Sequence, residues 1–282
     1  MPNKNTNKTA VVTGACGGLG LALTRLLADR GWRVFAADCD ERGLAELADE
    51  QNLEPIFIDV TNSESVAEAA ASVSAGTDAL DAVVNFAGIL RVGSLIEVEE
   101  SVLQRVLDIN LMGTYRVNKA FFPLLSEGDN KGRIVNVSSE TGWHTASPFN
   151  GPYAMSKYGI EAYSDALRRE LSLYDVPVIC VQPGPFKTEL VADTVDGFSQ
   201  AAAGSELYSR QLEHFGELVR EANKRAHDPS LLAEVIHRAL TDAKPKSRYS
   251  VKADRGRSFL EWLPMSVADG IFRKMLANPQ SN

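Results

Sequence analysis

Short apolar runs alternate along this chain with segments of helical periodicity, and this alternation restricts the possible folds more than any other feature. The runs are almost continuously apolar, as in Ala-Val-Val-Thr and Val-Ile-Cys-Val. Continuous hydrophobicity indicates strands covered on both faces, as in a parallel sheet. The expected strands are Thr9–Thr13, Arg33–Asp38, Pro55–Val60, Ala82–Ala87, Arg133–Ser138, Pro177–Gln182 and a weaker one at Arg248–Val251.

Helical segments separate these runs, and repeated strand–helix units join parallel strands by right-handed crossovers. No internal repeat, linker or low-complexity segment divides the chain. We therefore predict an α/β fold: one domain with a doubly wound parallel sheet of about seven strands and helices on both faces. The expected helices include Gly18–Arg30, Glu41–Glu50, Ser63–Ser74, Glu100–Ser126 and Pro152–Tyr174.

Composition excludes several classes of protein. The 282 residues are 44% hydrophobic, which suffices for one large core. A net charge of −8 disfavours nucleic acid as a partner, because such binding needs a basic surface. Three scattered cysteines, a polar N-terminus and no apolar run of ~18–20 residues predict a cytoplasmic protein without a membrane span.

A glycine-rich stretch, Thr-Gly-Ala-Cys-Gly-Gly-Leu-Gly, follows the first expected strand and opens the first expected helix. Glycines permit a tight turn and let a pyrophosphate approach the backbone. The helix N-terminus offers unpaired N–H groups and the positive end of its dipole. In this context the stretch predicts a Rossmann-type dinucleotide site. Its expected cofactor-binding residues are Gly14, Gly17, Gly18, Leu19 and Gly20.

Asp38 ends the second expected strand, where a carboxylate accepts hydrogen bonds from ribose hydroxyls and repels a 2′-phosphate. No Arg or Lys lies in the glycine turn or directly after Asp38, so we predict NAD rather than NADP. Ligands of open α/β sheets bind at the carboxyl ends of strands. The adenosine side of the site is therefore expected to include Asp59, Val60, Asn85, Ala87 and Gly88.

Tyr153 and Lys157 are four residues apart in an expected helix, so their side chains share one face. An isolated phenol has a pKa of about 10, too high for a base at neutral pH. A lysine ammonium ~4 Å away at an effective dielectric of ~20 would favour the phenolate by roughly 4 kcal/mol, or about three pK units. The pair therefore predicts a tyrosine poised for general acid–base catalysis.

These motifs, in this order, resemble those of the classical short-chain dehydrogenase/reductase family over nearly the whole chain. The resemblance implies an NAD-dependent alcohol dehydrogenase or ketoreductase. Phe86 is a departure, because the family more often has a second Asn at this position. The resemblance is carried by the glycine turn, Asn85-Phe-Ala-Gly88, Asn110, Ser139, Tyr153-x-x-x-Lys157 and Pro183-Gly184.

The resemblance also implies catalytic roles. Tyr153 would be the general acid/base, and Lys157 would lower its pKa and bind the nicotinamide ribose. Ser139 would bind the substrate oxygen, with Ser138 as the alternative; Ser139 is preferred because the family's reactive serine is usually the second of the pair. Asn110 would hold a water that links Lys157 to solvent, and its apolar neighbours predict that it is buried with a partner.

Two segments follow the sixth expected strand. By resemblance, Pro183, Gly184, Phe186 and Thr188 would contact the nicotinamide carboxamide. Residues 189–226 would form a substrate loop, either a mobile lid or an ordinary helical excursion. The apolar segment 258–277, interrupted by Pro264, would cover the cleft, join a subunit interface or touch a membrane; packing against its own domain or a partner is the preferred interpretation.

The remaining chemistry-bearing residues suggest no metal site, because the four histidines and three cysteines show no ligand spacing. His144 is interpreted as a surface-loop residue that could approach the substrate. Cys16 lies near a helix N-terminus, where a thiol pKa can fall. The preferred interpretation of Cys16 is a small buried residue.

The predicted organisation is a flexible N-terminus at 1–8 and a single NAD-binding catalytic domain at 9–282. The expected reaction moves a hydride between nicotinamide and a secondary alcohol or ketone with an apolar body, because residues 156–171 resemble the branch that handles retinol, hydroxysteroids and 3-hydroxybutyrate. The alternative is an NAD-binding sensor or scaffold without turnover, against which the complete set of acid–base residues argues. Helices Glu100–Ser126 and Pro152–Tyr174 resemble the family's four-helix interface, which predicts a homodimer or homotetramer.

Overall fold

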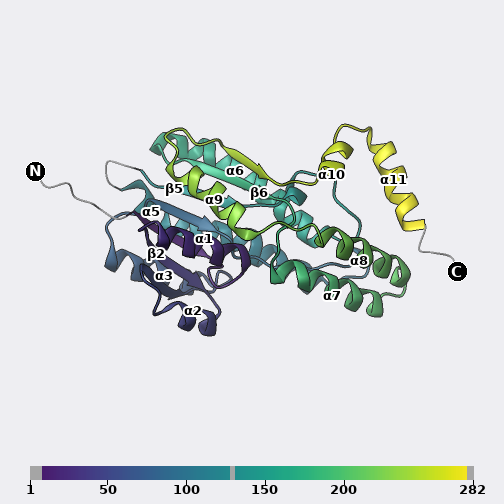
Figure 1. The fold of residues 1–282 in the computed structure, drawn as a ribbon, viewed down its shortest axis with the longest axis horizontal. Coiled ribbons are helices and arrows are strands. Elements are labelled where there is room, and N and C mark those ends of the chain that lie inside the picture. Colours follow the sequence, from purple (N-terminus) through teal and green to yellow (C-terminus); the bar gives the residue numbers. More distant parts are fainter. Residues whose placement is uncertain (1–7, 128–130, 278–282) are drawn as a thin grey trace, which may run out of the picture.

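The computed structural model describes residues 8–127 and 131–277, which form one seven-stranded parallel sheet flanked by helices (Figure 1). The strand order is β3-β2-β1-β4-β5-β6-β7, so the chain begins in mid-sheet and extends to both edges. This order confirms the predicted doubly wound, Rossmann-type α/β fold. The strands are β1 (Thr9–Thr13), β2 (Arg33–Asp38), β3 (Leu53–Phe57), β4 (Ala82–Asn85), β5 (Arg133–Val137), β6 (Val178–Pro183) and β7 (Arg248–Val251).

Helices cover both faces of the sheet because successive strand residues point to opposite sides. In β1, Ala10 and Val12 belong to one buried apolar cluster and Val11 belongs to the other. The first cluster includes side chains of α1 (Gly18–Asp29), α2 (Glu41–Leu47) and α9 (Pro229–Thr241). The second includes side chains of α3 (Ser63–Gly76), α5 (Gly113–Ser126) and α6 (Gly151–Leu171).

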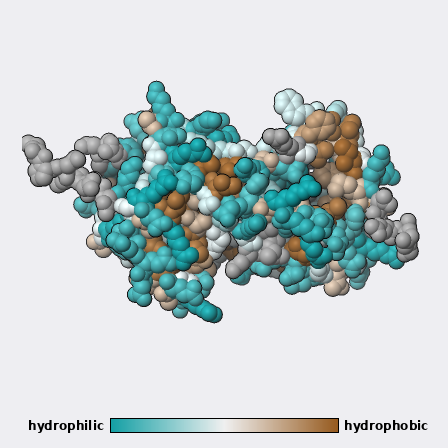
Figure 2. Space-filling model, in the orientation of Figure 1, coloured by the Kyte–Doolittle hydropathy of each residue, from teal (hydrophilic) through white to brown (hydrophobic). Residues whose placement is uncertain are grey.

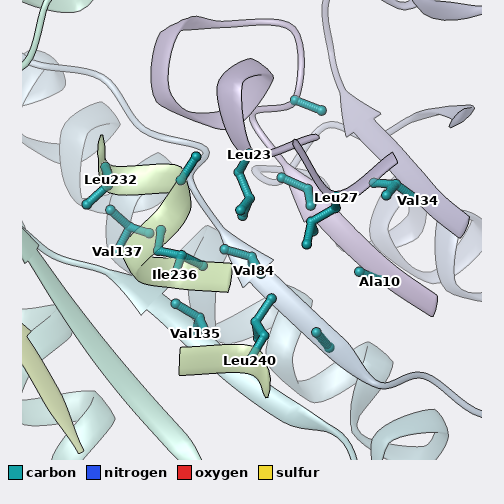
Figure 3. Packing of buried hydrophobic residues seen from close by; sticks show 14 of the residues in the cluster. Ala10, Leu23, Leu27, Val34, Val84, Val135, Val137, Leu232, Ile236 and Leu240 are labelled. Atoms are coloured by element: carbon teal, nitrogen blue, oxygen red, sulfur yellow. The ribbon is translucent and has the colours of Figure 1, made fainter. Parts of the chain in front are cut away.

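Figure 3 shows how the first cluster joins segments that are far apart in the sequence. Leu23 and Leu27 of α1 and Ile236 of α9 converge on the strand residue Val84, and all of them are fully buried. Each such side chain stabilises the fold by roughly 1.5–3 kcal/mol. This packing fixes the start of α1 against the end of β1, where the predicted nucleotide site lies.

Side-chain caps fix where several helices begin. Asp40 accepts a hydrogen bond from the Arg42 amide before α2. Asn62 does the same for two amides at the start of α3. Asp228 caps α9, whose first residue is Pro229. These residue types are favoured at their positions because they satisfy amides that the helix itself leaves unpaired.

Several predicted elements differ from the structure by one to three residues at their ends, and two of the differences have a clear physical reason. The strand expected at Pro55–Val60 is Leu53–Phe57, at the edge of the sheet where proline is tolerated. The helix expected at Glu100–Ser126 is interrupted between α4 (Glu100–Leu107) and α5 by a π-helical turn, Asp108–Met112. The flexible N-terminus predicted at 1–8 lies, apart from Lys8, outside the described residues.

The segment expected as a substrate loop is a helical hairpin of α7 (Glu189–Gly204) and α8 (Ser209–Asn223). A third apolar cluster joins the hairpin to Phe149. Side chains of α11 (Met265–Ala277) pack onto this cluster, so the C-terminal segment contacts its own domain. The buried members of the cluster are Phe149, Phe198, Ala202, Leu212 and Phe215, and Phe272, Met275 and Leu276 pack against them.

The two C-terminal helices are separated at Pro264 and leave apolar side chains on the surface. α10 (Arg255–Leu260) precedes this proline and α11 follows it. Figure 2 shows hydrophobic surface gathered over these helices, where Phe259, Trp262 and Met265 are more than half exposed. Within the described ranges, no helix has both the length and the hydropathy needed to cross a membrane.

Candidate active site

The glycine-rich turn joins β1 to α1 and has no room for side chains at two of its glycines. A Cβ on Gly20 would lie 2.0 Å from the Gly14 carbonyl oxygen, and one on Gly14 would lie 2.9 Å from the Ala87 amide nitrogen. Gly14 also has a φ of 68°, which glycine adopts without strain. By contrast, a Cβ on Gly17 would meet nothing within 4 Å. The turn is therefore tight inside and open outside, as a phosphate cradle requires.

The start of α1 has the chemistry of an anion site. No side chain caps this helix at Gly17, and its first turn contains no acidic residue. Thr188, from the segment after β6, packs against the same turn: a Cβ on Gly18 would lie 2.8 Å from the Thr188 methyl carbon. The structure therefore brings Thr188 to the glycine turn across 170 residues of sequence. These residues fit the pyrophosphate of a dinucleotide.

Asp38 lies beside this turn at the end of β2. Its carboxylate oxygens accept hydrogen bonds from the amides of Cys16, at 3.0 Å, and Asp40, at 3.1 Å. The two bonds fix the carboxylate at the edge of the cradle, as the spacing predicts. The neighbouring Cys16 thiol has its pKa raised to about 12 by burial and by the charges of Asp38 and Asp40. The lowered thiol pKa that was considered for Cys16 is therefore wrong.

The residues expected on the adenosine side occupy different environments. The Asp59 carboxylate accepts two hydrogen bonds from Thr61 in a local turn just beyond β3. Val60 is buried against Gly113, and its carbonyl accepts a hydrogen bond from Arg116. The backbone of Ala87 touches the glycine turn.

Asn85 belongs to a buried cluster of amides that the sequence did not reveal. Its side-chain nitrogen donates to the side-chain oxygens of Asn118, at 2.8 Å, and Asn136, at 3.0 Å. Asn118 also donates to Tyr163, and Asn136 donates to Ser164. The Asn85 side chain thus ties β4 to β5, α5 and α6 beneath the site. The Asn85 side-chain oxygen, by contrast, is buried without a hydrogen-bond partner among the described residues.

Lys157 and Tyr153 lie on one face of α6, as their spacing predicts. The Lys157 Nζ donates a 2.9 Å hydrogen bond to the Val137 carbonyl at the end of β5. The same nitrogen lies 5.5 Å from the centroid of the Tyr153 ring. Lysine is therefore anchored to the sheet and directed over the phenol ring.

The pKa values of Tyr153 and Lys157 in the structure differ from those expected from their spacing on the helix. Burial and the charge of Glu140 raise the pKa of Tyr153 to about 12, although a hydrogen bond with Ser139 opposes the rise. Burial lowers the pKa of Lys157 to about 8, against the influence of Cys180 and Glu161. The predicted lowering of the Tyr153 pKa by Lys157 is therefore wrong for the protein by itself, because burial raises this pKa.

The two serines that follow β5 have different surroundings. Ser138 is buried and donates a 3.3 Å hydrogen bond to the Lys157 carbonyl, so it joins the strand to α6. Ser139 caps a short 3₁₀ turn by accepting a hydrogen bond from the Thr141 amide, and it also reaches Tyr153. Of the two serines, Ser139 is the one beside the phenol.

Asn110 is fully buried at the centre of the π-helical turn. Its side chain exchanges hydrogen bonds with the backbone N–H and C=O of Ile89, at 2.8 and 2.9 Å, and donates to Ser156 at 2.9 Å. The Ser156 hydroxyl in turn donates to the Tyr153 carbonyl. Asn110 therefore connects the loop after β4 to the turn of α6 that carries Tyr153. The π-helical turn, a feature frequent at functional sites, places it there.

The segment after β6 provides backbone more than side chains. A Cβ on Gly184 would lie 2.1 Å from the Lys252 carbonyl oxygen, so only glycine fits after Pro183. Phe186 is buried in the first apolar cluster and faces the ring of His227 at 6.0 Å. The Phe186 side chain is therefore a core residue, and only its backbone is available to a cofactor.

Sequence reasoning missed a set of contacts between the Ser139 turn and α10. The buried Glu140 carboxylate accepts hydrogen bonds from the Asp254 amide, at 2.7 Å, and Arg257, at 3.2 Å. His144 is fully buried and contacts Ser258 at 3.0 Å, so its interpretation as a surface residue is wrong. Glu261 accepts a hydrogen bond from Thr145. The partners are more than 100 residues apart, and no local pattern signals such pairing.

Comparison with known proteins is consistent with this geometry. A model of the short chain dehydrogenase family matches residues 8–197. The chain belongs to the short-chain dehydrogenase family. Retinol dehydrogenase 16 of Mus musculus is 34% identical over 284 residues, which cover 94% of this chain and 87% of that protein. The 17-beta-hydroxysteroid dehydrogenase type 6 of Rattus norvegicus is 34% identical over 279 residues, with 93% and 87% covered.

Solved structures of this family have the same fold. A short-chain dehydrogenase from Streptomyces avermitilis superimposes with a TM-score of 0.77 at 25% identity and covers 99% of this chain and 100% of its own. Actinorhodin polyketide ketoreductase with NADPH superimposes with a TM-score of 0.74 at 26% identity, covering 89% and 97%. The chain is therefore an oxidoreductase of this family, and family and fold together imply a nicotinamide cofactor.

Proposed function

We propose that this protein is an NAD-dependent oxidoreductase that transfers a hydride between nicotinamide and a secondary alcohol or ketone, with Tyr153 as general acid/base. The observation that carries the proposal is the convergence of Ser139, Tyr153 and Lys157 at the end of β5, beside a glycine turn open to a phosphate. A protein that only binds a nucleotide has no chemical need for Ser139, Tyr153 and Lys157 in this arrangement.

The bound nicotinamide would supply the hydride acceptor or donor. Ser139 orients the substrate oxygen and stabilises the charge that develops on it. Tyr153 gives a proton to this oxygen in reduction and takes it in oxidation. Because its pKa lies at about 12, the phenol holds its proton at neutral pH, which suits it as the acid. Its use as a base depends on the Lys157 ammonium nearby.

The choice of NAD rests on Asp38. Its carboxylate is fixed by the amides of Cys16 and Asp40 at the end of β2, where the ribose of a dinucleotide binds in this fold. A negative charge there accepts hydrogen bonds from a ribose diol and repels a 2′-phosphate.

The proposed substrate has an apolar body. Relatives bear the names retinol dehydrogenase and 17-beta-hydroxysteroid dehydrogenase. In this chain the α7–α8 hairpin and α11 contribute the third apolar cluster, beside Phe149 of the loop that leads to Tyr153. An apolar region next to the loop that leads to Tyr153 favours a substrate that gains from leaving water.

The experiment is to follow NADH or NADPH formation at 340 nm with purified protein and a panel of hydroxysteroids, retinol and small secondary alcohols. Turnover with NAD and an apolar alcohol is the expected result. Turnover with NADP alone would overturn the cofactor assignment. NAD binding without turnover on any alcohol of the panel would favour a sensor or scaffold protein.

A further inference from the structure

Glu161 is a buried carboxylate one helical turn beyond Lys157 on α6. The two residues are 8% and 6% exposed. Residues four apart on a helix lie on the same face, so both side chains point toward the sheet. Glu161 has no role in the proposed reaction as described above. Burying a carboxylate costs folding free energy unless other groups compensate its charge.

Side chains from two strands hold the Glu161 carboxylate. One oxygen accepts hydrogen bonds from the Cys180 thiol, at 3.1 Å, and from the Gln182 amide, at 3.0 Å. Cys180 and Gln182 alternate along β6, so both face α6. The other oxygen accepts from Arg248 of β7 at 3.0 Å. Burial and the adjacent carboxylate raise the pKa of Cys180, which keeps the thiol protonated as a donor.

Lys157 needs a negative charge nearby. Its Nζ donates to a neutral carbonyl, that of Val137, and burial alone lowers its pKa toward neutrality. The influences that resist this loss of charge come from Cys180 and Glu161. Cys180 is protonated at neutral pH, whereas the Glu161 carboxylate is paired with an arginine. Of the two, Glu161 carries the charge that matters.

We propose that Glu161 is a positioning residue of the active site, whose carboxylate, held by Arg248, Gln182 and Cys180, keeps the buried Lys157 side chain an ammonium. The inference rests on the proposed role of Lys157 in catalysis. It also means that β6 and β7 contribute to the active site, because their side chains hold the Glu161 carboxylate.

Other ionisable groups lie around the pair. On α6 itself they are Tyr153, on the N-terminal side of Lys157, and Asp165, one turn beyond Glu161. Asp165 pairs with Arg248 at 2.9 Å. From the turn after β5, Glu140 acts on Tyr153. Asp165 therefore shares the arginine with Glu161 but lies two helical turns from Lys157, which makes it a matched control.

The test is an NMR titration of lysine labelled with ¹³C at Cε, with the Lys157 signal assigned by its loss in Lys157→Met. Glu161→Gln is expected to lower the midpoint of the Lys157 titration by about one pH unit. Asp165→Asn removes the same charge and an Arg248 contact, and it is expected to shift the midpoint far less. An unchanged midpoint in Glu161→Gln, or equal shifts in both variants, would overturn the proposal.

A second variant is expected to shift the midpoint of the Lys157 titration in the opposite direction. It keeps the proposal testable if Glu161→Gln does not fold. Arg248→Met removes the competing cation and is expected to raise the Lys157 midpoint; a lowered or unchanged midpoint contradicts the proposal. The titration uses neither cofactor nor substrate. Failure to observe any enzymatic turnover would therefore count against the proposed function, whereas a failed titration would count against Glu161 alone.

Discussion

At the scale of single residues, the environment of Tyr153 has opposing effects on the pKa of its phenol. Desolvation raises its phenol pKa, and the hydrogen bond with Ser139 opposes the rise. The Lys157 Nζ lies 5.5 Å from the ring centroid, and an ammonium that close favours the phenolate. Under the proposed mechanism, turnover depends on the hydroxyl oxygen of Tyr153 and not on its ring.

Tyr153→Phe removes this oxygen and keeps the ring. We expect kcat to fall by roughly 10²–10⁴-fold, because general acid–base catalysis contributes about that much. NAD affinity, measured by calorimetry, is expected to stay within a few-fold of wild type, since Lys157 and the glycine turn are untouched. Turnover at the wild-type rate would remove Tyr153 from the mechanism.

Asp38 decides the proposed cofactor preference at the same scale. Asp38→Ala combined with Cys39→Arg removes the carboxylate and adds a cation that can pair with a 2′-phosphate. The ratio of kcat/KM for NAD to that for NADP is expected to fall at least tenfold. Cys39→Arg alone is the control, because it keeps the carboxylate. An unchanged ratio in the double variant would exclude the assigned role of Asp38.

At the scale of elements, α10 acts as a strap across the reactive turn. Four residues in α10 or directly beside it contact residues 140–145: Asp254, Arg257, Ser258 and Glu261. One of these contacts is the Glu140–Arg257 ion pair, whose side chains are 11% and 25% exposed. Glu140 directly follows Ser139, so the strap anchors the turn that carries this serine.

Arg257→Met leaves a buried carboxylate without its cation, so we expect the free energy of unfolding at neutral pH to fall by about 3 kcal/mol. Burial raises the pKa of Glu140 above its unfolded value, and Arg257 restrains the rise. Stability from such a group is complete below the unfolded pKa and is lost as pH rises through the folded one. The defect should therefore shrink as the pH is lowered to about 4, where Glu140 is protonated in the folded state and mostly protonated in the unfolded state.

Urea unfolding of Arg257→Met at about pH 4 and at neutral pH measures this difference. Arg273→Met, which removes an exposed arginine from α11, is the control and is expected to show no such pH dependence. A defect of equal size at both pH values would show that the strap does not act through the charge of Glu140.

For the molecule as a whole, the apolar runs sufficed to predict the sheet. β1 and β2 match their expected bounds because their apolar runs end abruptly, and β7 also matches although Arg248 and Ser250 interrupt its apolar character. The predicted bounds of β3 are wrong because β3 lies at the edge of the sheet, where it pairs with a strand on one side only. Polar residues and proline are tolerated there, so Glu54 and Pro55 interrupt the apolar run on which the prediction depends. At the site, spacing sufficed for Tyr153 and Lys157 on one helix. The Asn110 turn and the Glu140–Arg257 pair depend on contacts between distant segments, which leave no local pattern.

We also predict that whole molecules pair through the face formed by α5, α6 and the π-helical turn before α5, where Met112, Tyr115 and Met155 are each about 40% exposed or more. Apolar side chains grouped on neighbouring elements favour a second copy as their cover. Tyr115→Lys is expected to shift sedimentation toward monomer. Leu173→Lys, at a position 85% exposed beyond the end of α6, is the control and should leave the oligomer intact. A monomeric wild-type protein would refute the prediction.

The strap also has a consequence for the order in which the protein is made. Synthesis runs from the N-terminus, so the glycine turn, Ser139 and Tyr153 leave the ribosome before α10 exists. Until then Glu140 lacks the Arg257 cation and the turn that carries Ser139 lacks its anchor. We therefore expect the turn that carries Ser139 to reach its final position only after α10 has been made, later in synthesis than the glycine turn.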